Sequence, residues 1–229
     1  SLNSLANFAY NNPGYCYPEV ATSGKVIEAS GMGHPLLGYE IRVVNDFSVK
    51  RKGLIIIITG ANMAGKSTFL RTVAVNLVLA MTGAPVCAGE MSFSPVRLFT
   101  SMRTTDSLSH SESYFYAELK RLKILKEKLE NDEDIFFILD EILKGTNSTD
   151  KSLGSKLFMR QMVALGGTGL IATHDISLGE MESEFPENIV NKCFEIEIDG
   201  ENISFDYILR DGITRKMNAA VLMKQMGIA

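Results

Sequence analysis

The chain has 229 residues, which is enough for one sizeable hydrophobic core. Its 23 Lys and Arg against 27 Asp and Glu give a formal net charge of −4, which argues against a dedicated nucleic-acid-binding surface, since such surfaces carry clustered positive charge. A hydrophobic fraction of 45% and a charged fraction of 22% exclude global disorder. The 3 cysteines are widely spaced, which excludes a disulfide framework or a zinc site and favours a reducing, cytoplasmic location.

No stretch of the sequence is suited to span a membrane, because the longest apolar stretch, residues 73–88, is interrupted by polar and turn-forming residues. The first residues, 1–4, have neither a Met nor a basic region. We therefore expect no signal peptide and no membrane segment, and we expect the chain to be a piece of a longer parent protein.

Strand and helix patterns alternate along the chain. Apolar periodicity predicts helices over residues 67–81, 115–129 and 152–165. Runs of apolar residues predict buried strands over 54–58, 136–139 and 170–172, and alternation predicts half-exposed strands over 41–47, 193–198 and 203–209, the last two as a hairpin around Gly200. This order predicts an α/β fold with a largely buried sheet.

The outer face of the predicted 115–129 helix is rich in Lys and Arg. Glu118, Glu127 and Glu130 dilute that charge, so we interpret the face as a solvated surface, with nucleic-acid contact as the alternative.

A phosphate-binding motif follows the first buried strand. Residues 60–67 fit G-x-x-x-x-G-K-[ST] and stand between a predicted strand and a predicted helix. Glycines let backbone N–H groups curl around a phosphate, and the helix N-terminus adds the positive end of its dipole. Lys66 can reach the β- and γ-phosphates, and the Ser67 hydroxyl can ligate Mg²⁺. The motif predicts a nucleoside triphosphate site formed by Gly60, Ala61, Asn62, Met63, Ala64, Gly65, Lys66, Ser67 and Thr68.

Two further motifs end buried strands. Asp140 and Glu141 close the strand at 136–139, where Asp140 can hold Mg²⁺ through water and Glu141 can act as the general base on an attacking water. His174 follows the strand at 170–172, and the carboxyl ends of parallel strands are where α/β proteins bind ligands. We therefore expect His174 to contact the γ-phosphate, although a lone His is more often incidental.

Taken together, these motifs resemble the MutS mismatch-repair family. The run from Gly60 to Arg71, including Asn62-Met63, resembles its P-loop; residues 140–146 resemble its acidic motif and the following loop, and Ala172-Thr173-His174 its histidine switch. Residues 33–36 and 45–46 resemble early segments of the same ATPase domain. The resemblance implies residues 1–24 as a lead-in from the parent's lever region and residues 25–229 as the ATPase domain.

The family belongs to the ABC-type ATPases, in which two ATPase domains dimerise around shared nucleotides. This implies a P-loop NTPase fold with a mostly parallel central sheet flanked by helices and an additional antiparallel part. It also implies that Ser113 completes the partner's site in trans and that residues 41–45, with Asn45, line the adenine. The expected function is hydrolysis of ATP with Mg²⁺, driving dimerisation and DNA clamp movements, with DNA held by regions of the parent outside this chain.

Two departures from the family pattern leave alternatives open. Ser111 stands where the family usually has Gly, and the acidic Glu112 lies next to Ser113. One alternative is a nucleotide-gated dimerisation module with little turnover, and another is a MutS relative acting in recombination or branched-DNA processing rather than repair. A generic ABC transporter subunit fits the Asn62-Met63 pair poorly. In the P-loop, Ala64 replaces a usual Gly, which is tolerable if its φ is negative.

Overall fold

The computed structural model describes residues 2–22, 24, 26–102, 114–144, 147–199 and 202–214. The described chain forms two compact units, Ser1–Lys52 with Thr68–Val96, and Gly53–Ser67 with Arg97–Ala229. Each unit has its own sheet. Within the described residues, no helix combines the length and the hydrophobicity needed to span a membrane.

The second unit is built on a six-stranded sheet in the order β12-β9-β4-β8-β7-β6. All neighbouring pairs are parallel except β12 with β9. The strands are β4 (Ile55–Gly60), β6 (Arg97–Ser101), β7 (Ile135–Asp140), β8 (Thr168–Thr173), β9 (Ile189–Phe194) and β12 (Leu209–Asp211). Strands β4, β7 and β8 are buried along their whole length, as expected of parallel strands covered on both faces.

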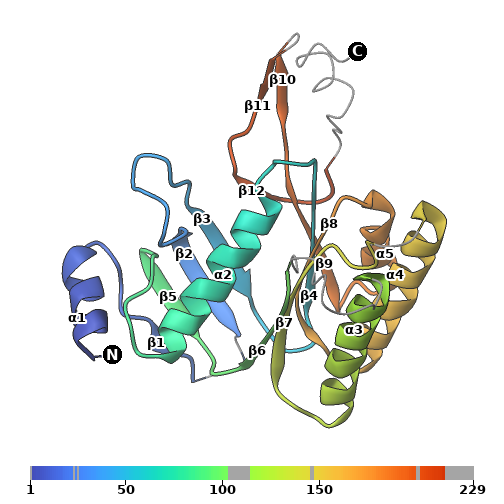
Figure 1. Ribbon diagram of the computed structural model, residues 1–229, viewed down its shortest axis with the longest axis horizontal. Helices are drawn as coiled ribbons and strands as arrows, with labels where there is room; N and C mark the ends of the chain where they lie inside the picture. Colours follow the sequence, from blue (N-terminus) through green and yellow to red (C-terminus); the bar gives the residue numbers. More distant parts are fainter. Residues whose placement is uncertain are drawn as a thin grey trace. The chain divides into compact units, whose positions relative to one another are not determined.

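Helices cover one face of this sheet. They are α3 (Tyr114–Glu130), α4 (Ser148–Ala164), the 3₁₀ helix η1 (Ile176–Leu178) and α5 (Met181–Glu184), which lie together beside the sheet in Figure 1. Their apolar side chains share one core with β4, β7, β8 and β9. Helix α4 begins after Asn147, whose side chain accepts a hydrogen bond from the Asp150 N–H (2.9 Å) and so caps the helix.

The first unit contains a four-stranded mixed sheet in the order β1-β5-β2-β3. Its strands are β1 (Glu19–Val20), β2 (Ile27–Met32), β3 (Asn45–Val49) and β5 (Glu90–Phe93), and its helices are α1 (Leu2–Asn11) and most of α2 (Lys66–Met81). Phe69 of α2 packs edge-on against Phe47 of β3. The fully buried Asn76 of α2 is hydrogen-bonded to Gly33 and Cys87, which joins three segments of this unit.

The structure confirms an α/β fold with a mostly parallel sheet and an additional antiparallel part. The three predicted helices are α2, α3 and α4, and the three predicted buried strands are β4, β7 and β8. The predicted hairpin is formed by β10 (Glu197–Asp199) and β11 (Asn202–Ser204), which project beyond β9 and β12 in Figure 1.

Three predicted strand boundaries are wrong. The strand predicted over 41–47 begins only at Asn45, because residues 38–42 form a turn in which the N–H groups of Ile41 and Arg42 both donate to Gly38 O. The strand predicted over 193–198 is divided between β9 and β10. The strand predicted over 203–209 is interrupted after Ser204, where Tyr207 adopts a left-handed φ of 56° and β12 then pairs with β9 instead. Apolar alternation continues across both breaks, so the sequence pattern does not mark them.

Candidate functional site

The phosphate-binding motif joins β4 to α2. Gly60 and Gly65 adopt φ values of 157° and 103°, and a Cβ on Gly60 would lie 2.9 Å from Phe194 O, so both positions need glycine. Met63 is also left-handed, at φ 68°. Ala64 is not among the residues with positive φ, so its replacement of the usual Gly carries no backbone strain, as expected. The N-terminus of α2 therefore opens directly onto a curled loop, which is the geometry of an anion site.

Lys66 lies at the centre of this loop with only 6% of its surface exposed. Its Nζ donates to Gly60 O (2.6 Å) and Ala61 O (2.8 Å), so two of its three protons are used by the loop and one is left for a phosphate oxygen. Burial lowers the pKa of Lys66 below its ordinary 10.5, while the charges of Glu141 and Asp140 act in the opposite direction. The ammonium group is thus held in the loop by carbonyl groups and nearby carboxylates.

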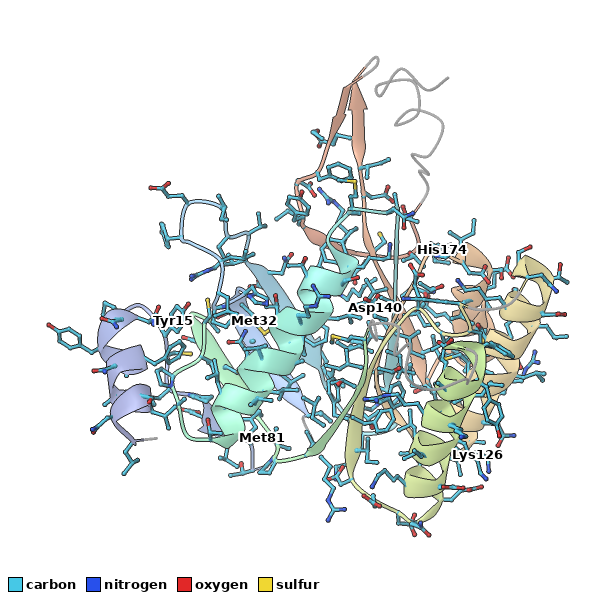
Figure 2. The ribbon with its side chains drawn as sticks, viewed as in Figure 1. Tyr15, Met32, Met81, Lys126, Asp140 and His174 are labelled. Atoms are coloured by element: carbon cyan, nitrogen blue, oxygen red, sulfur yellow. The ribbon has the colours of Figure 1, made fainter. Side chains whose placement is uncertain are left out.

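Asp140 ends β7 on the strand adjacent to β8, whose next residue is His174 (Figure 2). The residue is 5% exposed, and its negative charge acts on the Lys66 ammonium group. A buried carboxylate needs a cationic partner. Oxygen ligands suit Mg²⁺, so Asp140 and the Ser67 hydroxyl fit the predicted metal site, where an ion would add positive charge beside the phosphates.

Glu141 faces His174. Its N–H donates to Ala172 O (2.9 Å), its φ is 56°, and its Oε1 lies 3.2 Å from His174 Nδ1. Nδ1 makes no hydrogen bond of regular geometry among the described residues, so the pair is a close polar contact. The structure thus brings the predicted base and the predicted γ-phosphate sensor together.

Two lysines flank this pair. Lys144 Nζ lies 3.9 Å from Glu141 Oε2, and Lys151 Nζ lies 3.4 Å from His174 Nε2. Burial by itself would raise the pKa of Glu141, but His174, Lys144 and Lys151 outweigh it and hold that pKa below 4.5. Because an ammonium group can only donate, Nε2 accepts from Lys151, and the proton of the neutral ring lies on Nδ1, toward Glu141.

The sequence did not single out Tyr207, whose ring lies against the loop. A Cβ on Gly65 would lie 2.9 Å from Tyr207 Cδ1, and the ring stacks on Phe205 with 6.1 Å between centroids. Asp206 Oδ1 accepts from the Ile208 N–H (3.0 Å), which closes the turn that carries Tyr207. With 42% of its surface exposed, this aromatic residue offers an apolar surface beside the phosphate loop. Residues 203–209 have the alternating pattern of a strand, so the sequence did not indicate that Tyr207 lies beside the phosphate loop.

The remaining predicted site residues are exposed, belong to the first unit or lie outside the described residues. Asn62 and Met63 are exposed on the loop, and Thr68 is exposed in the first turn of α2, where its carbonyl accepts from Thr72. Asn45 starts β3 and belongs to the first unit, whereas the phosphate loop belongs to the second. Ser113, with Ser111 and Glu112, lies outside the described residues. The roles expected for Asn45 and Ser113 stay predictions.

The family follows from comparison with known proteins. Residues 56–227 match the sequence profile described as MutS domain V. The chain belongs to the MutS domain V family. This domain is an ABC-type P-loop ATPase domain, in agreement with the fold and with the curled loop between β4 and α2.

The relatives that carry this domain are longer proteins. DNA mismatch repair protein MutS of Thermotoga maritima is 29% identical over 231 residues, which cover 99% of this chain and 29% of that protein. MutS of Fusobacterium nucleatum is 32% identical over 213 residues, covering 90% of this chain and 23% of that protein. DNA mismatch repair protein MSH4 of Arabidopsis thaliana is 28% identical over 230 residues, covering 98% and 28%. The chain spans less than a third of the length of these relatives.

Proposed function

We propose that the chain binds ATP with Mg²⁺ at residues 60–68 and hydrolyses it to ADP and phosphate. The observation that carries the proposal is the convergence, in one unit, of the buried Lys66, the buried Asp140 and the Glu141–His174 pair at the ends of neighbouring strands. A phosphate loop alone would account for nucleotide binding but not for hydrolysis. A carboxylate base and a histidine next to it add what hydrolysis requires.

Each residue has a distinct part in this reaction. Lys66 uses its remaining proton to bind a phosphate oxygen and offsets the charge that develops as the γ-phosphoryl group transfers. Glu141 orients a water molecule for in-line attack and takes its proton, and His174 contacts the γ-phosphate. Ser67 and Asp140 would hold the metal. Tyr207 offers a stacking surface for the base, a position for which residues 41–45 supply no aromatic side chain.

Turnover by the purified chain tests this proposal. We expect Mg²⁺-dependent release of phosphate that falls roughly 10²- to 10⁴-fold in Glu141→Gln while nucleotide binding is retained, because only the proton acceptor is removed. Lys66→Ala should lose binding itself. Equal turnover in wild type and Glu141→Gln would refute the role of Glu141.

We further propose that ATP brings two copies together, with Ser113 completing the partner's site, and that the parent protein couples this motion to DNA. The basis is the family resemblance of the segment around Ser113. Sedimentation velocity with ATP and Mg²⁺ on Glu141→Gln should show a dimer that Ser113→Ala abolishes. A monomer at high concentration with demonstrated ATP binding would contradict dimerisation of the chain by itself.

A module with little turnover is the second candidate. The lysines beside Glu141 favour it, because a carboxylate whose pKa is held below its ordinary value is a weaker proton acceptor. Ser111 and Glu112 are the other reason for it. ATP-dependent dimers without measurable phosphate release would select this candidate. Whether the parent acts in mismatch repair or in recombination is a separate question that its N-terminal region would decide, since a mismatch-reading domain there favours repair.

A further inference from the structure

One carboxylate of α3 lies on the inner side of the helix. Leu122, Leu125 and Leu129 are buried and face the core of the second unit. Glu118 precedes Leu122 by four residues and so continues the same stripe by one more turn, whereas the neighbouring Leu119 is exposed. The sequence grouped Glu118 with Glu127 and Glu130 on the basic outer face; the structure leaves Glu127 and Glu130 exposed there, but it turns Glu118 to the inner side. A carboxylate on an inner stripe requires partners.

Its partners are two consecutive backbone amides. The N–H of Leu143 donates to Glu118 Oε1 (2.7 Å), and the N–H of Lys144 donates to Glu118 Oε2 (3.1 Å). Each carboxylate oxygen thus holds one amide of the loop that follows β7. Such bonds to a charged acceptor are stronger than neutral ones and fix orientation as well as distance.

The loop held in this way has an unfavourable backbone. Glu141 and Leu143 adopt φ values of 56° and 58° without being glycine. Left-handed backbone is unfavourable for a residue with a side chain, so it persists only where the surroundings impose it. The Glu118 carboxylate holds the backbone amides of Leu143 and Lys144, and these two bonds supply such a constraint.

We infer that Glu118 is a positioning residue, which holds the 141–144 loop in the conformation that directs the Glu141 side chain toward His174. The inference rests on the proposed function, since it assigns Glu118 to the geometry of the proposed base. It acts through the backbone and touches neither nucleotide nor water. Loss of the clamp should therefore lower the rate of the chemical step and leave nucleotide binding by the loop at 60–67 almost unchanged.

The test is Glu118→Gln in the full chain, with Glu127→Gln as its control. A glutamine keeps the size of the side chain but turns an NH₂ group toward one of the two amides, so that one bond becomes a clash of donors. Glu127 lies on the exposed face of the same helix, 3.5 Å from Lys123. We expect kcat to fall roughly 10- to 100-fold in Glu118→Gln, with KM and the thermal midpoint close to those of wild type. Glu127→Gln should leave all three unchanged.

Amide hydrogen exchange at Leu143 and Lys144 separates failure of this inference from failure of the proposed function. Faster exchange at these two amides in Glu118→Gln supports the clamp even if wild type releases no phosphate. Unchanged exchange at both amides overturns the inference, whatever the turnover. A parallel loss of kcat, nucleotide affinity and thermal midpoint would also overturn it, because Glu118 would then be a general stabilising residue.

Discussion

Replacement of Asn76 by alanine should weaken the first unit severely. Asn76 is a polar residue of α2 with 0% exposed surface, and its side chain makes three hydrogen bonds. Its Nδ2 donates to Gly33 O (3.0 Å) and to Thr72 O (2.9 Å), and its Oδ1 accepts from the Cys87 N–H (2.8 Å). An apolar or smaller residue at this position leaves backbone groups of two other segments without this partner.

The magnitude follows from the groups that lose their partner. A buried polar group left unsatisfied costs roughly 1–3 kcal/mol. Gly33 O and the Cys87 N–H are two such groups, whereas Thr72 O is a helix carbonyl that keeps its place in the backbone ladder. We therefore expect Asn76→Ala to lower the free energy of unfolding by roughly 2–6 kcal/mol, which for a chain of this size is a fall of roughly 4–24 °C in the thermal midpoint.

Equilibrium unfolding in urea, followed by circular dichroism, measures this loss. Asn76→Asp provides a second arm, because it keeps the acceptor for Cys87 but loses both donors and buries a charge; it should be at least as destabilised. Asn131→Ala, at an exposed position just after α3, is the control and should change stability by about 0.5 kcal/mol or less. A loss in Asn76→Ala no larger than in this control would refute the reasoning.

Two further substitutions follow from close contacts. Gly169→Ala would place a Cβ 2.2 Å from Phe137 O on the neighbouring strand, so β7 and β8 must separate, and we expect a loss of about 3 kcal/mol or more in urea unfolding. Lys151→Met removes the donor to His174 Nε2, so the ring proton should no longer be confined to Nδ1, and the ¹⁵N shifts of the His174 ring should change toward the other tautomer.

Matched controls decide both outcomes. Gly38→Ala meets nothing within 4 Å and should be nearly neutral, so an equal loss at both glycines would contradict the steric argument. Lys156 lies on the same helix as Lys151 but pairs with Glu180 (3.3 Å), and Lys156→Met should leave the His174 ring unchanged. Identical ring shifts in wild type and Lys151→Met would show that Lys151 does not determine the tautomer.

The sequence was sufficient for the parts whose chemistry is local. A run of isoleucines, a glycine-rich turn and a helical period occur in one continuous segment, so β4, the phosphate loop and α2 could all be read from it. The same holds for Asp140 and Glu141 at the end of β7 and for His174 after β8. Each is placed by a strand that ends there, and parallel strands end at one edge of a sheet.

Only the tertiary structure decided which of these residues meet. Strand β8 lies between β4 and β7, and this order, which no local pattern encodes, sets His174 beside Glu141. Successive helix residues differ by about 100°, so one charged residue among leucines can face either way, and packing turned Glu118 inward and Leu119 outward. Tyr207 reaches Gly65 through a left-handed turn without glycine. Contacts distant in sequence impose such conformations, and the local sequence does not encode them.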